Sequence, residues 1–228
     1  MTTAASRGSA LIEVVAVTAV AFLIREVLRR FGAGIGSGAV STIVTLALAT
    51  WLLRRRGQSW GAIGFRRPLS LRTTAAWTVG LLLADMLLVP LATSILGTAF
   101  HLPTQHLESF ADLRGNTARY LLLLIPISWG TAAFGEELLF RGFLARRLAD
   151  AFGGSGRAEL AAAVGQATLF GLGHAYLGPR GMLNAGGLGL LAGLCYRWNG
   201  RNLWPLIVAH GLVDSVGMTV LYLGMQHS

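Results

Sequence analysis

The chain has 228 residues, of which 54% are hydrophobic and only 13% are charged, and its formal net charge is +9. Because about 25% of the residues in soluble domains are charged, this composition excludes an ordinary water-soluble globule. The Arg residues stand between apolar segments, so we expect contact with anionic lipid and no nucleic acid partner.

Apolar segments recur along the whole chain and are close to the ~20 residues that a helix needs to cross a bilayer. We predict membrane spans at 9–27, 37–53, 73–96, 118–148, 159–177, 181–198 and 203–224. The fourth is too long for one crossing, so we expect a kink at Pro126 or an extension out of the membrane, and the last span can break near Gly217. The predicted fold is an all-α polytopic membrane bundle of about 7–8 transmembrane helices, with 1–228 as a single domain.

The two longer connections between spans differ in charge. Segment 97–117 has a single Arg, whereas segment 54–72 contains Arg54, Arg55, Arg56, Arg66, Arg67 and Arg72. The positive-inside rule therefore predicts that 54–72 is cytoplasmic and 97–117 external. The basic residues after the first span oppose this orientation, which leaves a re-entrant or interfacial first span as an alternative. We expect a multi-pass protein of a bacterial plasma membrane.

The fourth span contains charged residues, which cost at least ~2.5–3.5 kcal/mol each at mid-bilayer on insertion scales. Glu137 and Arg141 are four residues apart on one helix face, so the acid and the base can neutralise each other. Glu136 is turned by ~100° from Glu137 and faces a different neighbour. We predict that Glu137 is structural and that Glu136 is a free general base, with a purely structural charge cluster as the alternative.

Two later spans each place a histidine in an apolar sequence. His174 follows Gly171 and Gly173, which leave room for a partner helix or for substrate. His210 and Asp214 are four residues apart on one helix face, so Asp214 can hold one ring nitrogen and direct the other inward, or both can contact one metal ion. A structural hydrogen bond is the alternative for each histidine.

We expect these three spans to meet, because polar groups in an apolar layer avoid isolation in one hydrated pocket. Two histidines and a carboxylate are a common hydrolytic zinc set, so Glu136, His174 and His210 are candidate ligands for a divalent metal such as zinc. Helix rise places His174 deeper than the other two, so the fifth helix must begin below the membrane plane for all three to meet. Asp85, five residues before Pro90, can join this pocket or hydrate a kink, and we expect the structural role.

The polar residues form three motifs in order: Glu136-Glu137-x-x-x-Arg141, Phe170-x-x-x-His174 and His210-x-x-x-Asp214. Together they resemble the EExxxR, FxxxH and HxxxN or HxxxD motifs of the CPBP family of intramembrane proteases, also called the Abi or type II CAAX prenyl protease family. The motif-bearing core covers residues 118–218. The resemblance implies an endopeptidase that hydrolyses peptide bonds of a membrane-anchored protein or peptide substrate, which can be lipidated.

The resemblance also implies a role for each motif residue. Glu136 would activate water with the help of His174. Glu137 and Arg141 would hold the site together. No Ser or Cys stands convincingly beside the histidines, so we expect single-step hydrolysis without an acyl-enzyme.

The third motif leaves more than one interpretation. His210 and Asp214 would stabilise an oxyanion or bind a metal ion. Because an ionised carboxylate cannot donate a hydrogen bond to an oxyanion, Asp214 fits better as a partner of His210 or as a metal ligand, and we favour metal assistance. Two other functions remain: a non-catalytic bacteriocin-immunity or scaffolding protein, and an ion or proton transporter that uses the buried groups as a relay.

Overall fold

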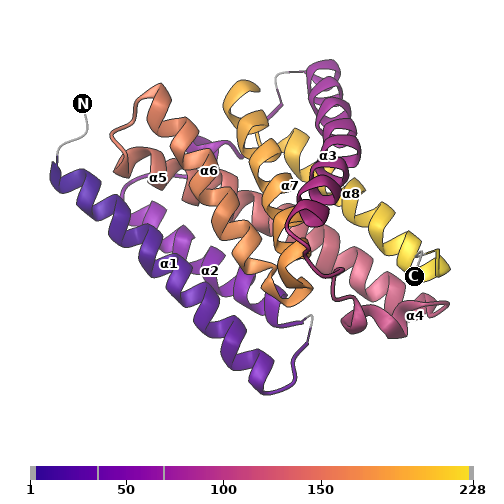
Figure 1. The fold of residues 1–228 in the computed structure, drawn as a ribbon. Coiled ribbons are helices and arrows are strands. Elements are labelled where there is room, and N and C mark those ends of the chain that lie inside the picture. The colour runs from indigo at the N-terminus through magenta and orange to yellow at the C-terminus, as the bar shows by residue number, and fades with distance from the viewer. Residues whose placement is uncertain (1–3, 35, 69, 226–228) are drawn as a thin grey trace.

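The computed structural model describes residues 4–34, 36–68 and 70–225. Throughout these residues the regular structure is helical and contains no strand, which confirms the predicted all-α fold. The chain forms a bundle whose separate long helices are α1 (Ala4–Arg30), α2 (Gly36–Arg55), α3 (Leu71–Ala99), α6 (Gly156–Gly173), α7 (Gly178–Trp198) and α8 (Trp204–Leu223) (Figure 1). Each of these helices covers most or all of one predicted span.

The fourth predicted span is one composite helix of 35 residues. It consists of α4 (Thr117–Leu122), the π-helical segment η3 (Leu123–Leu144) and α5 (Ala145–Ala151). At the end of η3 the Ala145 N–H bonds to Phe140 O, five residues back. The helix continues through Pro126 and, at 35 residues, is longer than one crossing requires. The break expected near Gly217 is absent, because α8 runs through this residue.

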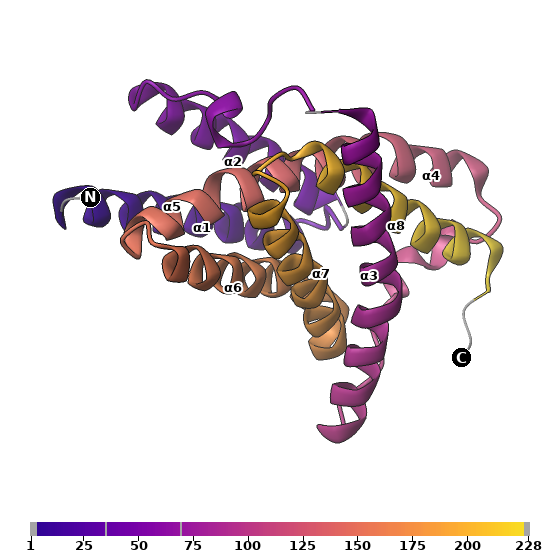
Figure 2. The same ribbon diagram turned by 90° about the horizontal axis from the view of Figure 1, so that it is seen from above.

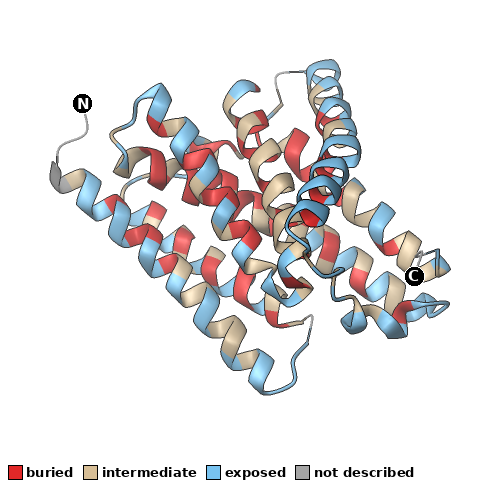
Figure 3. Ribbon diagram, viewed as in Figure 1, coloured by how far each residue is buried: buried red, intermediate tan, exposed pale blue. Residues whose placement is uncertain are grey.

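Four helices have both the length and the hydropathy of a membrane span among the described residues: α2, α3, the composite helix and α8. The outer face of α3 shows why the surroundings must be lipid. Leu83, Leu87, Leu91 and Ile95 are spaced one turn apart and are each more than half exposed. Such an apolar stripe would be costly in water, so the chain is an integral membrane protein. Exposed residues follow the outer faces of α1 and α3 (Figure 3).

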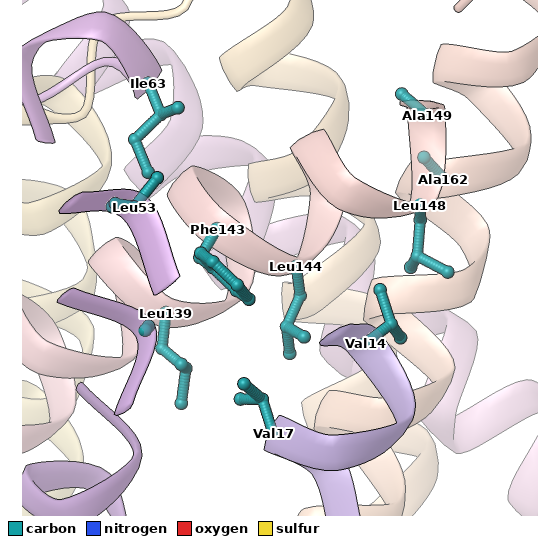
Figure 4. Packing of buried hydrophobic residues seen from close by; sticks show 11 residues of the cluster. Val14, Val17, Leu53, Ile63, Leu139, Phe143, Leu144, Leu148, Ala149 and Ala162 are labelled. Carbon is teal, nitrogen blue, oxygen red and sulfur yellow. The ribbon is translucent and has the colours of Figure 1, made fainter. Parts of the chain in front are cut away.

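The main apolar core holds the composite helix against α1, α2 and α6. Figure 4 shows its side chains, which include Val17 of α1, Leu53 of α2 and Phe143 of η3, each no more than 1% exposed. On the other side of the bundle, away from α1 and α2, α3 packs against α7 and α8 (Figure 2). The composite helix is thereby fixed in the middle of the protein, and both glutamates of the first motif lie on it.

Helices α6 and α7 approach closely through glycines. A Cβ atom at Gly171 would lie 2.8 Å from Met182 O, and one at Gly189 would lie 3.1 Å from Ala167 Cα. Small residues allow such close contact between membrane helices. This packing fixes the C-terminal end of α6, which carries the second motif.

Candidate active site

A cavity of about 320 Å³ lies between η3, α6, α7 and α8. Glu136 reaches it from η3, His174 from the end of α6, and His210 and Asp214 from successive turns of α8. Much of the remaining lining is apolar and includes Leu188. The structure therefore brings side chains from all three motifs to one cavity, as the burial argument predicted.

The two adjacent glutamates have different surroundings. Glu137 Oε1 lies 2.8 Å from Arg141 Nη1, and both side chains are only 1% exposed. Glu136 lines the cavity and has no hydrogen bond or ion pair with another described residue. The predicted pairing of Glu137 with Arg141 is present, and the carboxylate of Glu136 is available to a ligand in the cavity.

His210 is held by Glu137. Its Nδ1 lies 2.8 Å from Glu137 Oε1, so one carboxylate oxygen accepts hydrogen bonds from both the imidazole and the Arg141 guanidinium. Asp214 Oδ1 lies 3.8 Å from the other ring nitrogen, Nε2. The orienting role expected for Asp214 thus falls to Glu137, which leaves Nε2 facing the cavity.

His174 follows the last residue of α6 and is fixed by its own helix. The backbone N–H bonds to Gly171 O, and Nδ1 lies 2.8 Å from Phe170 O. Because a carbonyl oxygen can only accept, Nδ1 carries the proton and Nε2 is left as an acceptor. His174 lines the same cavity as Glu136 and His210, so the depth difference expected from helix rise does not keep it out of the site.

Phe170 connects the three motifs, a role that our sequence analysis missed. The Arg141 Cζ atom lies 4.5 Å from its ring centroid, in cation–π geometry. The ring centroids of His174 and His210 lie 4.6 and 6.1 Å from it. The available signal was its position one helical turn before His174, which allows both the carbonyl and the ring to orient the histidine.

Trp129 fixes α8 against η3 close to the cavity. Its Nε1 donates a hydrogen bond to Ser215 Oγ at 3.1 Å, and its ring lies over Gly211. A Cβ atom at Gly211 would lie 2.5 Å from the indole. Only glycine therefore allows this contact between the two helices, and the contact lies directly beside His210.

Replacing Gly211 by Ala is expected to lower the free energy of unfolding by about 1–3 kcal/mol, because the large, hydrogen-bonded indole must move. Thermal unfolding of the purified protein in detergent measures this effect. Gly217→Ala is the matched control on the same helix, since no heavy atom lies within 4 Å of its added Cβ. Equal melting temperatures for the two variants would contradict the prediction.

The side chains predicted to bind a metal do not form a ligand group as they stand. In the described ranges no three His, Cys, Asp or Glu side chains are arranged to hold a metal ion. The Nδ1 atoms of His174 and His210 are already engaged by Phe170 O and Glu137, so only their Nε2 atoms and the Glu136 carboxylate remain. To bind zinc, the two Nε2 atoms and a carboxylate oxygen of Glu136 would each have to lie ~2.0–2.2 Å from the metal ion.

Comparison with known families adds evidence that is independent of the geometry. Residues 118–216 match the family model described as type II CAAX prenyl endopeptidase Rce1-like. The matched stretch contains all three motifs and runs from the composite helix into α8. Neither a curated protein nor a solved structure gave a match.

Proposed function

We propose that this chain is an intramembrane endopeptidase, because residues 118–216 match the Rce1-like type II CAAX prenyl endopeptidase family, in agreement with the resemblance of the motifs. It hydrolyses peptide bonds of membrane-anchored or lipidated proteins in a bacterial plasma membrane. The observation that supports this proposal most is the single cavity shared by Glu136, His174 and His210 within a bundle of apolar helices.

The first step is the activation of a water molecule in the cavity. Glu136 is the acceptor with no competing partner among the described residues, so it takes the proton of the water as its oxygen attacks the substrate carbonyl carbon. The second O–H of the water donates to His174 Nε2, which is an acceptor because Nδ1–H donates to Phe170 O. Together the two acceptors orient the lone pair of the water toward the carbonyl carbon.

The second step stabilises the charge that forms on the carbonyl oxygen. His210 donates Nδ1–H to Glu137, so in its protonated form it presents Nε2–H toward the cavity and to the oxyanion. Asp214, 3.8 Å from Nε2, is an acceptor that favours this proton. The C–N bond then breaks as Glu136 passes its proton to the leaving nitrogen, and a carboxylic acid and an amine are released.

Assistance by a divalent metal such as zinc, held by Glu136, His174 and His210, is a separate proposal. Dialysis of the purified protein against a chelator, followed by the return of zinc, tests it. Loss of cleavage followed by recovery supports metal assistance, whereas unchanged cleavage contradicts it.

Cleavage by the purified protein in liposomes tests the proposed function directly. We would offer a fluorescent peptide with a lipidated carboxyl-terminal segment and, separately, a transmembrane peptide. The wild type is expected to cleave at least one, and His174→Ala is expected to lower kcat by about 10²-fold or more, because the water loses an acceptor. His101→Asn is the control, since His101 is exposed in the loop after α3 and lies outside the cavity lining.

The outcomes separate the alternatives. Wild-type kcat in His174→Ala would remove this residue from the mechanism. If neither substrate is cleaved and ions cross the liposome membrane, the result would favour an ion or proton transporter that uses the buried charges as a relay. Absence of both activities would favour a non-catalytic protein.

A further inference from the structure

A second, much smaller cavity lies behind the catalytic side chains. It has a volume of about 20 Å³ and is lined by Asp85 of α3, Glu137 and Arg141 of η3, His210 of α8 and several apolar side chains. His210 lines both cavities, whereas Glu137 and Arg141 line only the small one. The small cavity therefore adjoins the group that orients His210, and Glu136 does not line it.

Three polar atoms of this lining have no hydrogen-bond partner among the described residues: Asp85 Oδ1, Glu137 Oε2 and Arg141 Nε. Their residues are 6%, 1% and 1% exposed, so bulk water does not satisfy them. Buried polar groups are costly when they are left unpaired. The three atoms come from two helices that are separate in sequence, yet they line one cavity.

The requirements of these atoms are complementary to those of a single water molecule. Asp85 Oδ1 and Glu137 Oε2 are acceptors and Arg141 Nε–H is a donor, while water supplies two donors and accepts in return. A cavity of ~10–15 Å³ or more holds one water, and buried waters typically make ~3 hydrogen bonds. The volume and the number of unpaired atoms therefore both correspond to one bound water.

We propose that Asp85 is a positioning residue, which acts through one buried water shared with Glu137 and Arg141. The water fixes the second oxygen of Glu137, whose first oxygen holds His210 Nδ1. Through this water, Asp85 of α3 is linked to Glu137, which orients His210 Nε2 toward the oxyanion. The catalytic part of this inference depends on the proposed function, but the presence of the water does not.

Kinetics of three variants on α3 test the catalytic part. Asp85→Leu removes the acceptor and is expected to lower kcat by about 10–100-fold with KM unchanged, as for other supporting residues of active sites. Asp85→Asn keeps an oxygen that can accept from the water, so it is expected to retain most of the wild-type kcat. Thr93→Val is the matched control, because Thr93 is equally buried on α3 and lines neither cavity.

Wild-type kcat in Asp85→Leu, or an equally low kcat in Asp85→Asn and Asp85→Leu, would overturn the inference. An experimental structure that resolves ordered water is the second test, and it is independent of activity and of variant folding. We expect one water within ~2.7–3.2 Å of all three atoms. A small cavity without this water would overturn the inference even if the protein is a protease. The water without any cleavage would refute the proposed function and leave the structural assignment intact.

Discussion

Replacing Glu136 by Gln is expected to lower kcat by about 10²–10⁴-fold, because the amide keeps the shape of the side chain but cannot accept a proton from water. Glu136 has no hydrogen bond or ion pair with another described residue, so the substitution leaves no buried group without its partner. We therefore expect the melting temperature to stay within the range of the wild type. A large loss of rate without a loss of stability distinguishes a catalytic base from a structural carboxylate.

The rate of peptide cleavage in liposomes and thermal unfolding in detergent measure the two quantities separately. Glu26→Gln is the matched control, because Glu26 is 43% exposed on α1 and pairs only with Arg29 and Arg30 among the described residues. It is expected to cleave as the wild type does. If Glu136→Gln cleaves within tenfold of the wild type, the general base lies elsewhere and the proposed first step is wrong.

Local patterns in the sequence were sufficient to predict the helices and the different surroundings of the two glutamates, one paired with Arg141 and one unpaired among the described residues. Apolar runs of span length predicted the long helices, because each run alone satisfies its backbone hydrogen bonds within the helix. The four-residue spacing of Glu137 and Arg141 predicted their pairing, because side chains at i and i+4 are neighbours on an α-helix. The pairing is present even though η3 is π-helical, so that the number of residues in its turn differs from the 3.6 of an α-helix.

Contacts between distant segments were not predictable in detail. His210 has two carboxylates within reach, and sequence spacing favoured Asp214, whereas the packing of α8 on η3 gives Nδ1 to Glu137, 73 residues away. Likewise, spacing alone could not indicate that the ring of Phe170 contacts Arg141 and both histidines. Asp85 was interpreted as structural from its position near Pro90, and only the packing of α3 shows that it faces Glu137.

Replacing Glu137 by Leu is expected to lower the free energy of unfolding by about 3–5 kcal/mol, because the Arg141 guanidinium is left as a buried charge without its counter-ion. Arg141 is 1% exposed, so water cannot replace the lost carboxylate without local opening of the bundle. The same change removes the partner of His210 Nδ1. Stability and activity should therefore both fall, and the single variant does not separate the two causes.

The double variant Glu137→Leu with Arg141→Met separates them. Replacement of a buried ion pair by apolar residues of similar volume is often neutral or stabilising by ~1–4 kcal/mol, so unfolding should return to the wild-type range or above it. His210 still lacks its orienting carboxylate, so kcat should stay about 10–100-fold below the wild type. Thermal unfolding and cleavage assays on the wild type and on the single and double variants measure both effects.

Each possible failure of this prediction has a specific meaning. Recovery of both stability and kcat in the double variant would show that Glu137 serves only to neutralise Arg141, and that His210 keeps its orientation by other contacts. Recovery of neither would show that the ion pair has geometric requirements that apolar side chains of similar volume do not meet. Recovery of stability alone is the expected result. The double variant removes both charges of the ion pair, so no unpaired charge remains buried. It does not restore the hydrogen bond from His210 Nδ1 to Glu137, so the imidazole stays without its orienting partner.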